Sequence, residues 1–196
     1  RGRSRLTTRC KASWVDRAFA NFKRHGFVIW PEQQFIYQNL YKRLKGKRII
    51  EAGCGIGTGT ALLSVHNDVL GTDVLSEHIR FARQIYPWCE FERWDIQSGR
   101  REGYDVLVAV EIIEHVENYE LGLRNMLASA TEFYISTPNR NNPALGQEKP
   151  INESHVKEFT THEFVEMLGR DVELLHWRDF SPLPLDTKVT PVVYHV

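Results

Sequence analysis

The chain has 196 residues, of which 42% are hydrophobic and 26% are charged, and its 25 Lys and Arg residues balance its 25 Asp and Glu residues. This length is typical of a single domain, and the composition excludes an intrinsically disordered chain. No apolar run approaches the roughly 20 residues that a bilayer-spanning helix needs, and no apolar signal core follows the basic first residues. We therefore expect a soluble, cytoplasmic protein.

The zero net charge results from an uneven distribution of charge along the chain. The first 48 residues contain 13 Lys and Arg but only two acidic residues, and the remainder carries the matching acidic excess. A basic arm of this kind can bind an anionic partner, either a nucleic acid or a membrane surface. The alternative is that it packs against the acidic part of the chain or stays solvated. We predict a basic N-terminal arm and helices that form a cap over residues 1–45, followed by a domain over residues 46–196.

The cysteines give a further indication of the compartment. Cys10, Cys54 and Cys89 are odd in number and form no CxxC motif, which argues against a disulfide framework and against a structural zinc site. A reducing compartment agrees best with this pattern.

Apolar residues at helical spacing predict two helices between Trp14 and Lys45, interrupted at Pro31. Further along, short apolar strands alternate with helices, which is typical of a doubly wound α/β domain with a parallel sheet. Ser76 and Thr160 are the expected N-caps of two of these helices. We expect strands at 48–51, 68–72, 89–93, 104–110, 131–136, 172–177 and 189–196, and helices at 58–64, 76–86, 119–128 and 160–168.

A glycine-rich turn follows the first predicted strand, in the sequence IIEAGCGIGTGT over residues 49–60. Glycines at the carboxyl end of a strand in an open α/β sheet let the backbone approach a ligand closely. The GxGxxG pattern of dinucleotide-binding proteins fails here, because its last position falls on Thr58 or Thr60. The turn therefore predicts a ligand site, and NAD is disfavoured as the ligand.

The turn matches the pattern ExGxGxG, with Glu51, Gly53, Gly55 and Gly57 at the defined positions. With this motif, the region over residues 48–164 resembles the class I S-adenosylmethionine-dependent methyltransferases. The resemblance implies a Rossmann-like, doubly wound α/β fold with a seven-stranded sheet, mostly parallel with an antiparallel last strand, and helices on both faces. It also implies that residues 46–196 form an S-adenosylmethionine-binding methyltransferase domain.

The same resemblance implies a set of cofactor-binding residues. In this family an acid at the end of the second strand accepts both ribose hydroxyls, because its two oxygens can each accept a hydrogen bond from the diol. Asp73 has this place, and Val74 beside it would flank the adenine. Asp95, after the third strand, matches the residue beside the adenine amino group, with the Ile96 backbone amide nearby. The complete expected set is Glu51, Gly53, Cys54, Gly55, Gly57, Asp73, Val74, Asp95, Ile96, Val110 and Glu111.

The sequence EIIEH over residues 111–115 follows the fourth predicted strand. It lacks the Asn/Asp-Pro-Pro-aromatic motif of methyltransferases that act on base amino groups, and no cysteine follows a proline, as cytosine C5 methylation usually requires. The ExxEH pattern, together with residues 133–141 and 155–159, resembles the ubiquinone-biosynthesis O-methyltransferase family. We therefore expect the acceptor to be a small-molecule hydroxyl, on a phenol, a sugar or a lipid precursor.

A helix over residues 111–116 would place Glu111, Glu114 and His115 on one face. Two carboxylates and one imidazole suit a hard divalent cation such as Mg²⁺, which would lower the pKa of a bound phenol. The alternative is that Glu111 contacts the methionine moiety of the cofactor, Glu114 caps a helix and His115 packs against a loop.

Two histidines are candidates for proton transfer. His155 follows the long predicted loop over residues 139–154, and as a general base it could take the acceptor proton near neutral pH. His115 is the other candidate, and both residues also have a purely structural interpretation. We expect the long loop and the N-terminal helices to close over the cofactor and to select the acceptor.

Two further functions agree with the same residues. The basic arm could hold RNA or DNA for a nucleic-acid methyltransferase, which predicts salt-sensitive binding. The chain could instead be a non-catalytic S-adenosylmethionine-binding partner subunit, which predicts cofactor binding without turnover.

Overall fold

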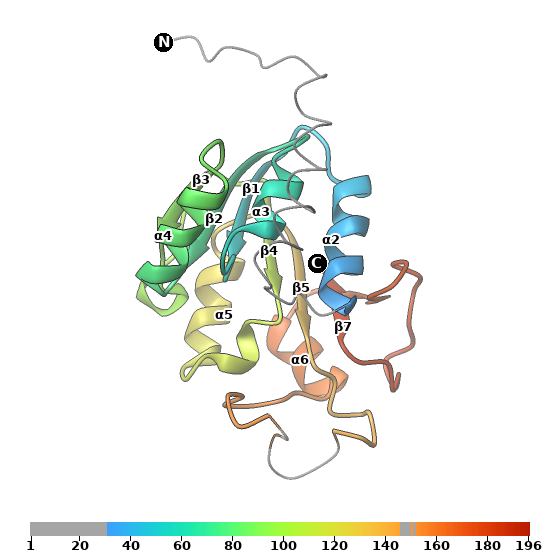
Figure 1. Cartoon of the computed structure of the whole chain (residues 1–196). Helices are drawn as coiled ribbons and strands as arrows, with labels where there is room; N and C mark the ends of the chain where they lie inside the picture. Colours follow the sequence, from blue (N-terminus) through green and yellow to red (C-terminus); the bar gives the residue numbers. More distant parts are fainter. Residues whose placement is uncertain (1–30, 146–149, 151) are drawn as a thin grey trace.

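A computed structural model describes residues 31–145, 150 and 152–196 of the chain (Figure 1). The strands are β1 (Arg48–Ala52), β2 (Asp68–Asp73), β3 (Glu90–Arg93), β4 (Val106–Val110), β5 (Glu132–Thr137), β6 (Glu173–His176) and β7 (Val192–His195). They form one seven-stranded sheet in the order β3-β2-β1-β4-β5-β7-β6. The first five strands pair in parallel, and β7 runs antiparallel to both β5 and β6. This topology confirms the predicted doubly wound sheet with an antiparallel last strand.

Helices cover both faces of the sheet, as predicted. The helices are α2 (Pro31–Arg43), α3 (Thr58–Leu63), α4 (Ser76–Ile85), α5 (Tyr119–Leu127) and α6 (Thr161–Leu168), with short 3₁₀ helices η1 (Ile96–Ser98) and η2 (Ile113–His115). Buried side chains of α2 and α3 share one apolar cluster with the sheet, and those of α5 and α6 share another. A third cluster joins α3 and α4 to β3.

The central strand β4 shows how the sequence builds a sheet with helices on both faces. All five of its residues are buried, as expected for a parallel strand covered on both faces. Val106, Val108 and Val110 belong to the cluster with α2 and α3, whereas Leu107 and Ala109 belong to the cluster with α5 and α6. The alternation of side chains along a strand thus divides one apolar run between two cores.

The predicted helix caps had different outcomes. Thr160 forms the expected capping box, in which its side chain accepts the Glu163 N–H while the Glu163 carboxylate accepts the Thr160 N–H. The prediction for Ser76 is wrong, because Ser76 is the first helical residue of α4 and the cap position belongs to Leu75. Leu75 makes no capping hydrogen bond with its side chain, and its own N–H donates to Asp73 Oδ1 at 2.9 Å just before the helix.

The N-terminal region is described from Pro31 onward. This proline starts α2, in agreement with the predicted break between two helices, and Ile36, Tyr37 and Leu40 of α2 are buried in the core. The predicted first helix and most of the basic arm lie outside the described residues. Within the described part of the chain, no helix has both the length and the apolar character needed to cross a membrane.

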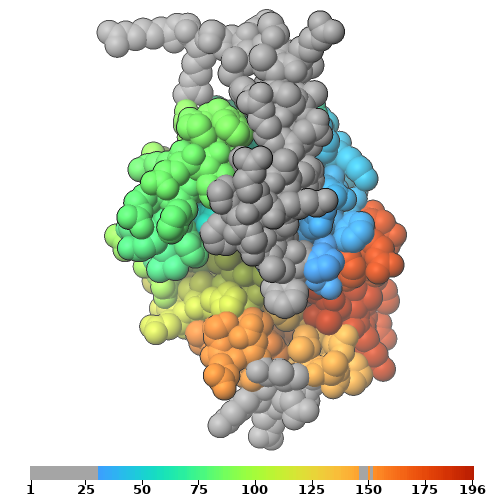
Figure 2. Space-filling view, viewed as in Figure 1, coloured from blue at the N-terminus to red at the C-terminus, as the bar shows by residue number. Residues whose placement is uncertain are grey.

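The carboxyl ends of β1 and β4 lie next to each other in the sheet. The chain winds from β1 toward one edge and from β4 toward the other, so this edge is the topological switch point where open α/β sheets bind ligands. Figure 2, in the same view as Figure 1, shows α4 (green) and α2 (blue) on opposite sides of this face of the molecule. Around residues 153–160 the chain (orange) lies below them.

Candidate functional site

The glycine-rich turn after β1 has a backbone that only glycine adopts readily. Gly53 has a φ of 70° and Gly57 has a φ of 88°. A Cβ atom on Gly53 would lie 2.0 Å from Ile112 Cδ1, and one on Gly57 would lie 2.5 Å from Phe91 Cζ. Both positions therefore need glycine for conformation and for space.

Asp73, the last residue of β2, is bonded to this turn. Its Oδ2 atom accepts the Gly55 N–H at 2.9 Å, and its Oδ1 atom accepts the Leu75 N–H at 2.9 Å. His78 Nδ1 lies 3.2 Å from Oδ1 and has no hydrogen-bond partner among the described residues. The carboxylate is thus fixed between the glycine turn and the start of α4.

A cavity of about 550 Å³ opens beside the turn, and we call it the glycine-loop cavity. The turn, the end of β4 and helices α2 and α4 provide its walls. It brings together the predicted residues Gly53, Cys54, Gly55, Val110 and Glu111. Its other lining residues are Gln33, Tyr37, Ile56, Thr58, Gly59, Glu77, His78, Phe81 and Ile112.

The remaining predicted cofactor residues do not line this cavity. Val74 is exposed, and Asp73 accepts a hydrogen bond from the glycine turn without lining the cavity. Ile96 is the first residue of η1 and is buried. Asp95 caps η1 by accepting the Gln97 N–H at 2.9 Å. Asp95 and Ile96 follow β3, which runs parallel to β2, so they lie with Asp73 at the carboxyl ends of the strands.

Glu51 in β1 is buried below the glycine turn and bonded to two helices. The Tyr37 hydroxyl of α2 donates to Oε1 at 2.5 Å, and the Thr60 hydroxyl of α3 donates to Oε2. Burial raises the pKa of Glu51 to about 6, against the effect of these two donors. Burial also raises the pKa of the nearby Cys54 thiol, so Cys54 lines the cavity as a neutral group.

A second cavity, of about 440 Å³, adjoins the first, and we call it the histidine cavity. It contains two imidazoles and four carboxylates, and no Lys or Arg is among the described residues that line it. Gln33 and Glu111 line both cavities. The other lining residues are Glu32, Glu114, His115, Pro138, Leu145, Asn152, His155, Glu158, Thr190 and Pro191.

Glu111 connects the two cavities through an unusual backbone conformation. Its φ of 56° is in the left-handed region, which non-glycine residues rarely adopt and which is common at functional sites. The Ser136 hydroxyl donates to Glu111 Oε1 at 2.8 Å. Burial raises the pKa of Glu111, and the charges of Glu32 and Glu158 raise it further.

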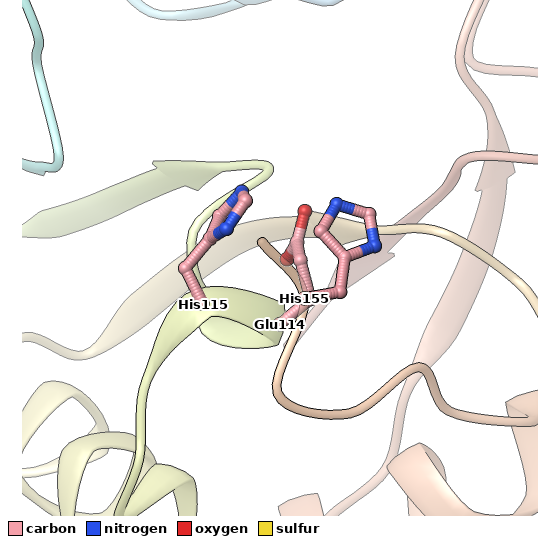
Figure 3. Close-up of side chains that lie close together, drawn as sticks. All are labelled: Glu114, His115 and His155. Carbon is pink, nitrogen blue, oxygen red and sulfur yellow. The ribbon is translucent and has the colours of Figure 1, made fainter. Parts of the chain in front are cut away.

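A helix over the whole of residues 111–116, the condition for the expected metal site, does not form. Only Ile113–His115 are helical, as the 3₁₀ turn η2, because the left-handed Glu111 turns the chain before it. Glu111 therefore does not share a helix face with Glu114 and His115. These two residues instead meet His155, as Figure 3 shows. One ligand atom from each of the three lies within 4.8 Å of the others.

The Glu114 carboxylate is buried in this group, and its position is well defined. The Thr137 hydroxyl donates to Oε2 at 3.1 Å, whereas Oε1 has no hydrogen-bond partner in the described part of the chain. Burial raises the pKa of Glu114, and the charge of Glu111 raises it further. A buried carboxylate oxygen without a donor is costly unless a ligand or a cation meets it.

The two histidines come from different segments and are held by different partners. His155 Nδ1 lies 2.7 Å from the buried Glu158 Oε1, and His115 Nδ1 lies 3.0 Å from the Ser154 carbonyl oxygen. The Glu114 carbonyl accepts the Val156 N–H at 2.7 Å, which holds the segment carrying His155 against η2. The two imidazole rings meet edge to face, with centroids 4.8 Å apart.

Most other lining residues of the two cavities were not predicted from the sequence, and four of them bear on the site. Glu158 lies three residues after His155, a spacing that could have indicated the pair. His78, Gln33 and Tyr37 belong to amphipathic helical segments with no motif, and only the tertiary packing brings them to the cavities.

Comparisons with known proteins agree with this architecture. The chain is 31% identical over 166 residues to a protein described as a probable S-adenosylmethionine-dependent methyltransferase from Mycolicibacterium smegmatis, covering 78% of this chain and 60% of the relative. It is 25% identical over 167 residues to a ubiquinone biosynthesis O-methyltransferase from Coxiella burnetii, covering 78% of this chain and 69% of the relative. The chain thus spans about 60% of the length of the mycobacterial relative. No family model matches it.

A solved structure has the same fold. The magnesium protoporphyrin IX methyltransferase from Synechocystis, with bound SAH, superposes with a TM-score of 0.61 and 14% identity. The match covers 96% of this chain and 98% of that one.

Proposed function

Since this chain belongs to the class I S-adenosylmethionine-dependent methyltransferases, we propose that it transfers a methyl group from S-adenosylmethionine to a hydroxyl oxygen of a small molecule. The observation that carries this proposal is the pair of adjoining cavities that share Glu111 and Gln33. One is formed around a glycine turn, and the other holds groups suited to proton transfer and to oxygen ligands.

For the donor, we propose that the glycine-loop cavity holds the methionine end and that Asp73 accepts the ribose hydroxyls. Asp73 already accepts two backbone N–H groups, so its carboxylate is preorganised as an acceptor at the end of β2. Val74, Asp95 and Ile96 would meet the adenine ring outside the cavity walls. The Gly53 and Gly55 backbone would lie against the amino-acid part of the donor, since glycine lets the backbone approach a ligand closely.

For the acceptor, we propose that the hydroxyl group enters the histidine cavity. Class I methyl transfer is an in-line displacement, so most of the rate comes from holding acceptor oxygen, methyl carbon and sulfur in line and from excluding water. His155 is the proposed base, because Glu158 holds Nδ1 and so fixes the orientation of the ring. His115 is the alternative base, since its ring lies at the same cavity.

As the alternative to a histidine base, we propose that Glu114, His115 and His155 bind a divalent cation, with Mg²⁺ and Mn²⁺ as the ions to test, because a ring nitrogen that binds the metal cannot also take the proton. The donor set fits, because Glu114 Oε1 is buried, has no partner among the described residues and lies in a group of three ligand atoms. A cation there would lower the pKa of a bound hydroxyl. Glu111 was expected in this set, but its backbone turn leaves it outside the group of three.

An oxygen acceptor is supported by two observations. The Coxiella relative is described as an O-methyltransferase, and the sequence after β4 lacks the motif of amino-group methylation. No Lys or Arg is among the described residues that line the histidine cavity, so none of them can pair with a phosphate group near the reacting atom. For this reason we favour a small molecule over a nucleic acid as acceptor.

Calorimetry with S-adenosylhomocysteine tests the proposed donor site. Wild type is expected to bind it, and Asp73→Ala is expected to lose about 100-fold in affinity, equivalent to ~2.8 kcal/mol, because the ribose loses its charged acceptor. Asp171→Asn is the control, since Asp171 is exposed between α6 and β6 and lines neither cavity. Unchanged affinity in Asp73→Ala would contradict the proposed ribose site.

A methylation screen tests the proposed acceptor class. Labelled S-adenosylmethionine would be incubated with the protein and with catechols, sugars or RNA in turn. We expect label in a hydroxyl-bearing small molecule. Label in RNA would favour the nucleic-acid alternative, in which the basic arm outside the described residues binds the phosphates. Tight binding of S-adenosylhomocysteine without any labelled product would favour the non-catalytic subunit.

A further inference from the structure

The two cavities meet between Gln33 and Glu111. Among the described residues, only these two line both the glycine-loop cavity and the histidine cavity. Gln33 comes from α2, and Glu111 directly follows β4. The residues that face the junction therefore come from two elements that are far apart in the sequence.

Gln33 is held at this junction by the packing of α2. Ile36 and Leu40 on the same helix are buried in the core. One turn after Gln33, the Tyr37 hydroxyl donates to Glu51 at 2.5 Å. Gly59 makes room for this contact, because a Cβ atom there would lie 2.3 Å from Tyr37 Cε1. The helix that carries Gln33 is thus bonded to the strand that carries the glycine turn.

Glu111 is held from the other side by the sheet. The Glu111 N–H donates to the Ser136 carbonyl oxygen at 3.1 Å, and the Ser136 hydroxyl donates to Glu111 Oε1 at 2.8 Å. These bonds hold the left-handed residue in place at the end of β4. Both sides of the junction are therefore held by packing and hydrogen bonds within the fold, as preorganised transfer sites require.

We propose that the methyl group passes between Gln33 and Glu111, and that Gln33 is a specificity-determining residue that orients the acceptor hydroxyl by a hydrogen bond. This inference rests on the proposed function, because it locates the transfer within the two cavities. The acceptor oxygen bonds to the methyl carbon as the carbon–sulfur bond breaks and its electron pair returns to sulfur. The hydroxyl proton passes to the base in the histidine cavity.

The chemistry of the junction also restricts the acceptor. The Glu111 carboxylate and the Gln33 amide oxygen both favour a partial positive charge, which the transferring methyl group carries. The histidine cavity beyond them has no Lys or Arg among its described lining residues. A carboxylate or phosphate beside the reacting hydroxyl would therefore find no Lys or Arg partner there, and we expect the hydroxyl to belong to a neutral or cationic part of the acceptor.

Sinefungin, a donor analogue with an amine in the position of the transferred methyl group, tests the location. Calorimetry would give the dissociation constants of sinefungin and of S-adenosylhomocysteine. The dissociation constant of S-adenosylhomocysteine divided by that of sinefungin is the preference for the amine. Wild type is expected to prefer sinefungin by about tenfold, equivalent to ~1.4 kcal/mol. Gln33→Leu is expected to lower this preference about threefold, and Glu111→Gln to abolish it. Gln33→Glu adds a carboxylate and is expected to raise it.

Gln34→Leu is the matched control, because Gln34 is the exposed neighbour on the same helix and lines neither cavity. It is expected to keep the wild-type ratio. If S-adenosylhomocysteine binds to all variants and the ratio is the same in each, the location between Gln33 and Glu111 is wrong. If wild type binds neither compound, the proposed function fails as a whole.

Discussion

The glycine-loop cavity and the histidine cavity lie side by side but are built in different ways. The backbone forms the first cavity: its glycines adopt left-handed conformations, and the Asp73 carboxylate accepts two of the neighbouring backbone N–H groups. The second is shaped by side chains, two of which, Glu114 and Glu158, are buried and have an oxygen atom without a partner in the described part of the chain. The difference teaches that the backbone turn is sensitive to side-chain atoms added at Gly53 and Gly57, whereas the cavity lined by charged side chains depends on ligands, cations and pH.

The largest effect is expected where the backbone of the glycine-loop cavity is changed. Gly53→Ala places a Cβ atom 2.0 Å from Ile112 and strains a left-handed residue. We expect a loss of at least about 100-fold in S-adenosylhomocysteine affinity, equivalent to ~2.8 kcal/mol, measured by calorimetry. Gly46→Ala is the control, because Gly46 is also left-handed, with a φ of 67°, but has no atom within 4 Å of an added Cβ. If both variants lost the same S-adenosylhomocysteine affinity, the loss in Gly53→Ala could not be assigned to the collision with Ile112.

The next effect concerns the dependence of the histidine cavity on a cation. Saturating Mn²⁺ is expected to raise the Tm of wild type by about 4 °C, because a ligand that binds only the folded state stabilises it. His155→Gln and Glu114→Gln remove proposed ligands and are expected to lose this shift. His162→Gln, an exposed histidine of α6, is expected to keep it.

Activity gives a second readout of the same cation. A chelator is expected to abolish methyl transfer by wild type, and added Mn²⁺ or Mg²⁺ to restore it. Undiminished turnover in the presence of chelator, together with an unchanged Tm in Mn²⁺, would remove the proposed cation site and leave His155 as a base alone.

A third effect is expected in the pH dependence of stability. Burial raises the pKa of Glu51 from 4.5 to about 6, so the folded state binds this proton more tightly than the unfolded state. The contribution of Glu51 to the free energy of unfolding is therefore fully present below pH 4.5 and falls as the pH rises to about 6. The loss is about 2 kcal/mol.

Urea unfolding between pH 4.5 and pH 7 measures this contribution. Glu51→Gln is expected to show a shallower fall with pH than wild type, because the amide does not ionise but can still accept the Tyr37 hydroxyl. Parallel curves for the two proteins would show that Glu51 titrates normally. Glu111 and Glu114 have raised pKa values as well, so a residual fall in Glu51→Gln is expected.

The smallest effect concerns the Ser136 hydroxyl at the junction. Ser136→Ala removes the donor to Glu111 Oε1 and an acceptor that lies 3.2 Å from the Glu111 nitrogen, and it is expected to lower the free energy of unfolding by about 1 kcal/mol. Ser98→Ala, which removes an exposed hydroxyl from η1, is expected to cost less. Urea unfolding of both variants makes the comparison, and an equal cost would indicate that Glu111 does not need its donor.

Much of the fold was predictable because it depends on local patterns. The alternation of apolar strands and helices gave the order of the elements, and the capping box at Thr160 located the start of α6. Element ends were less predictable. The last strand was expected from Val189 but begins at Val192, directly after Pro191, which has no N–H to donate to a neighbouring strand. The predicted start of α4 at residue 76 was right, but its cap was not, because the N-cap position belongs to Leu75, which makes no side-chain capping bond.

The sequence by itself determined the glycine turn, the acid at Asp73 and the doubly wound sheet, because each depends on residue type at a fixed spacing along the chain. Only the tertiary structure decided that Glu111 turns away from Glu114 and that His155 joins Glu114 and His115. It alone also brought Gln33 of α2 to the junction of the two cavities. The physical reason is that these contacts join segments far apart in the sequence, so they depend on how helices and loops pack on the sheet.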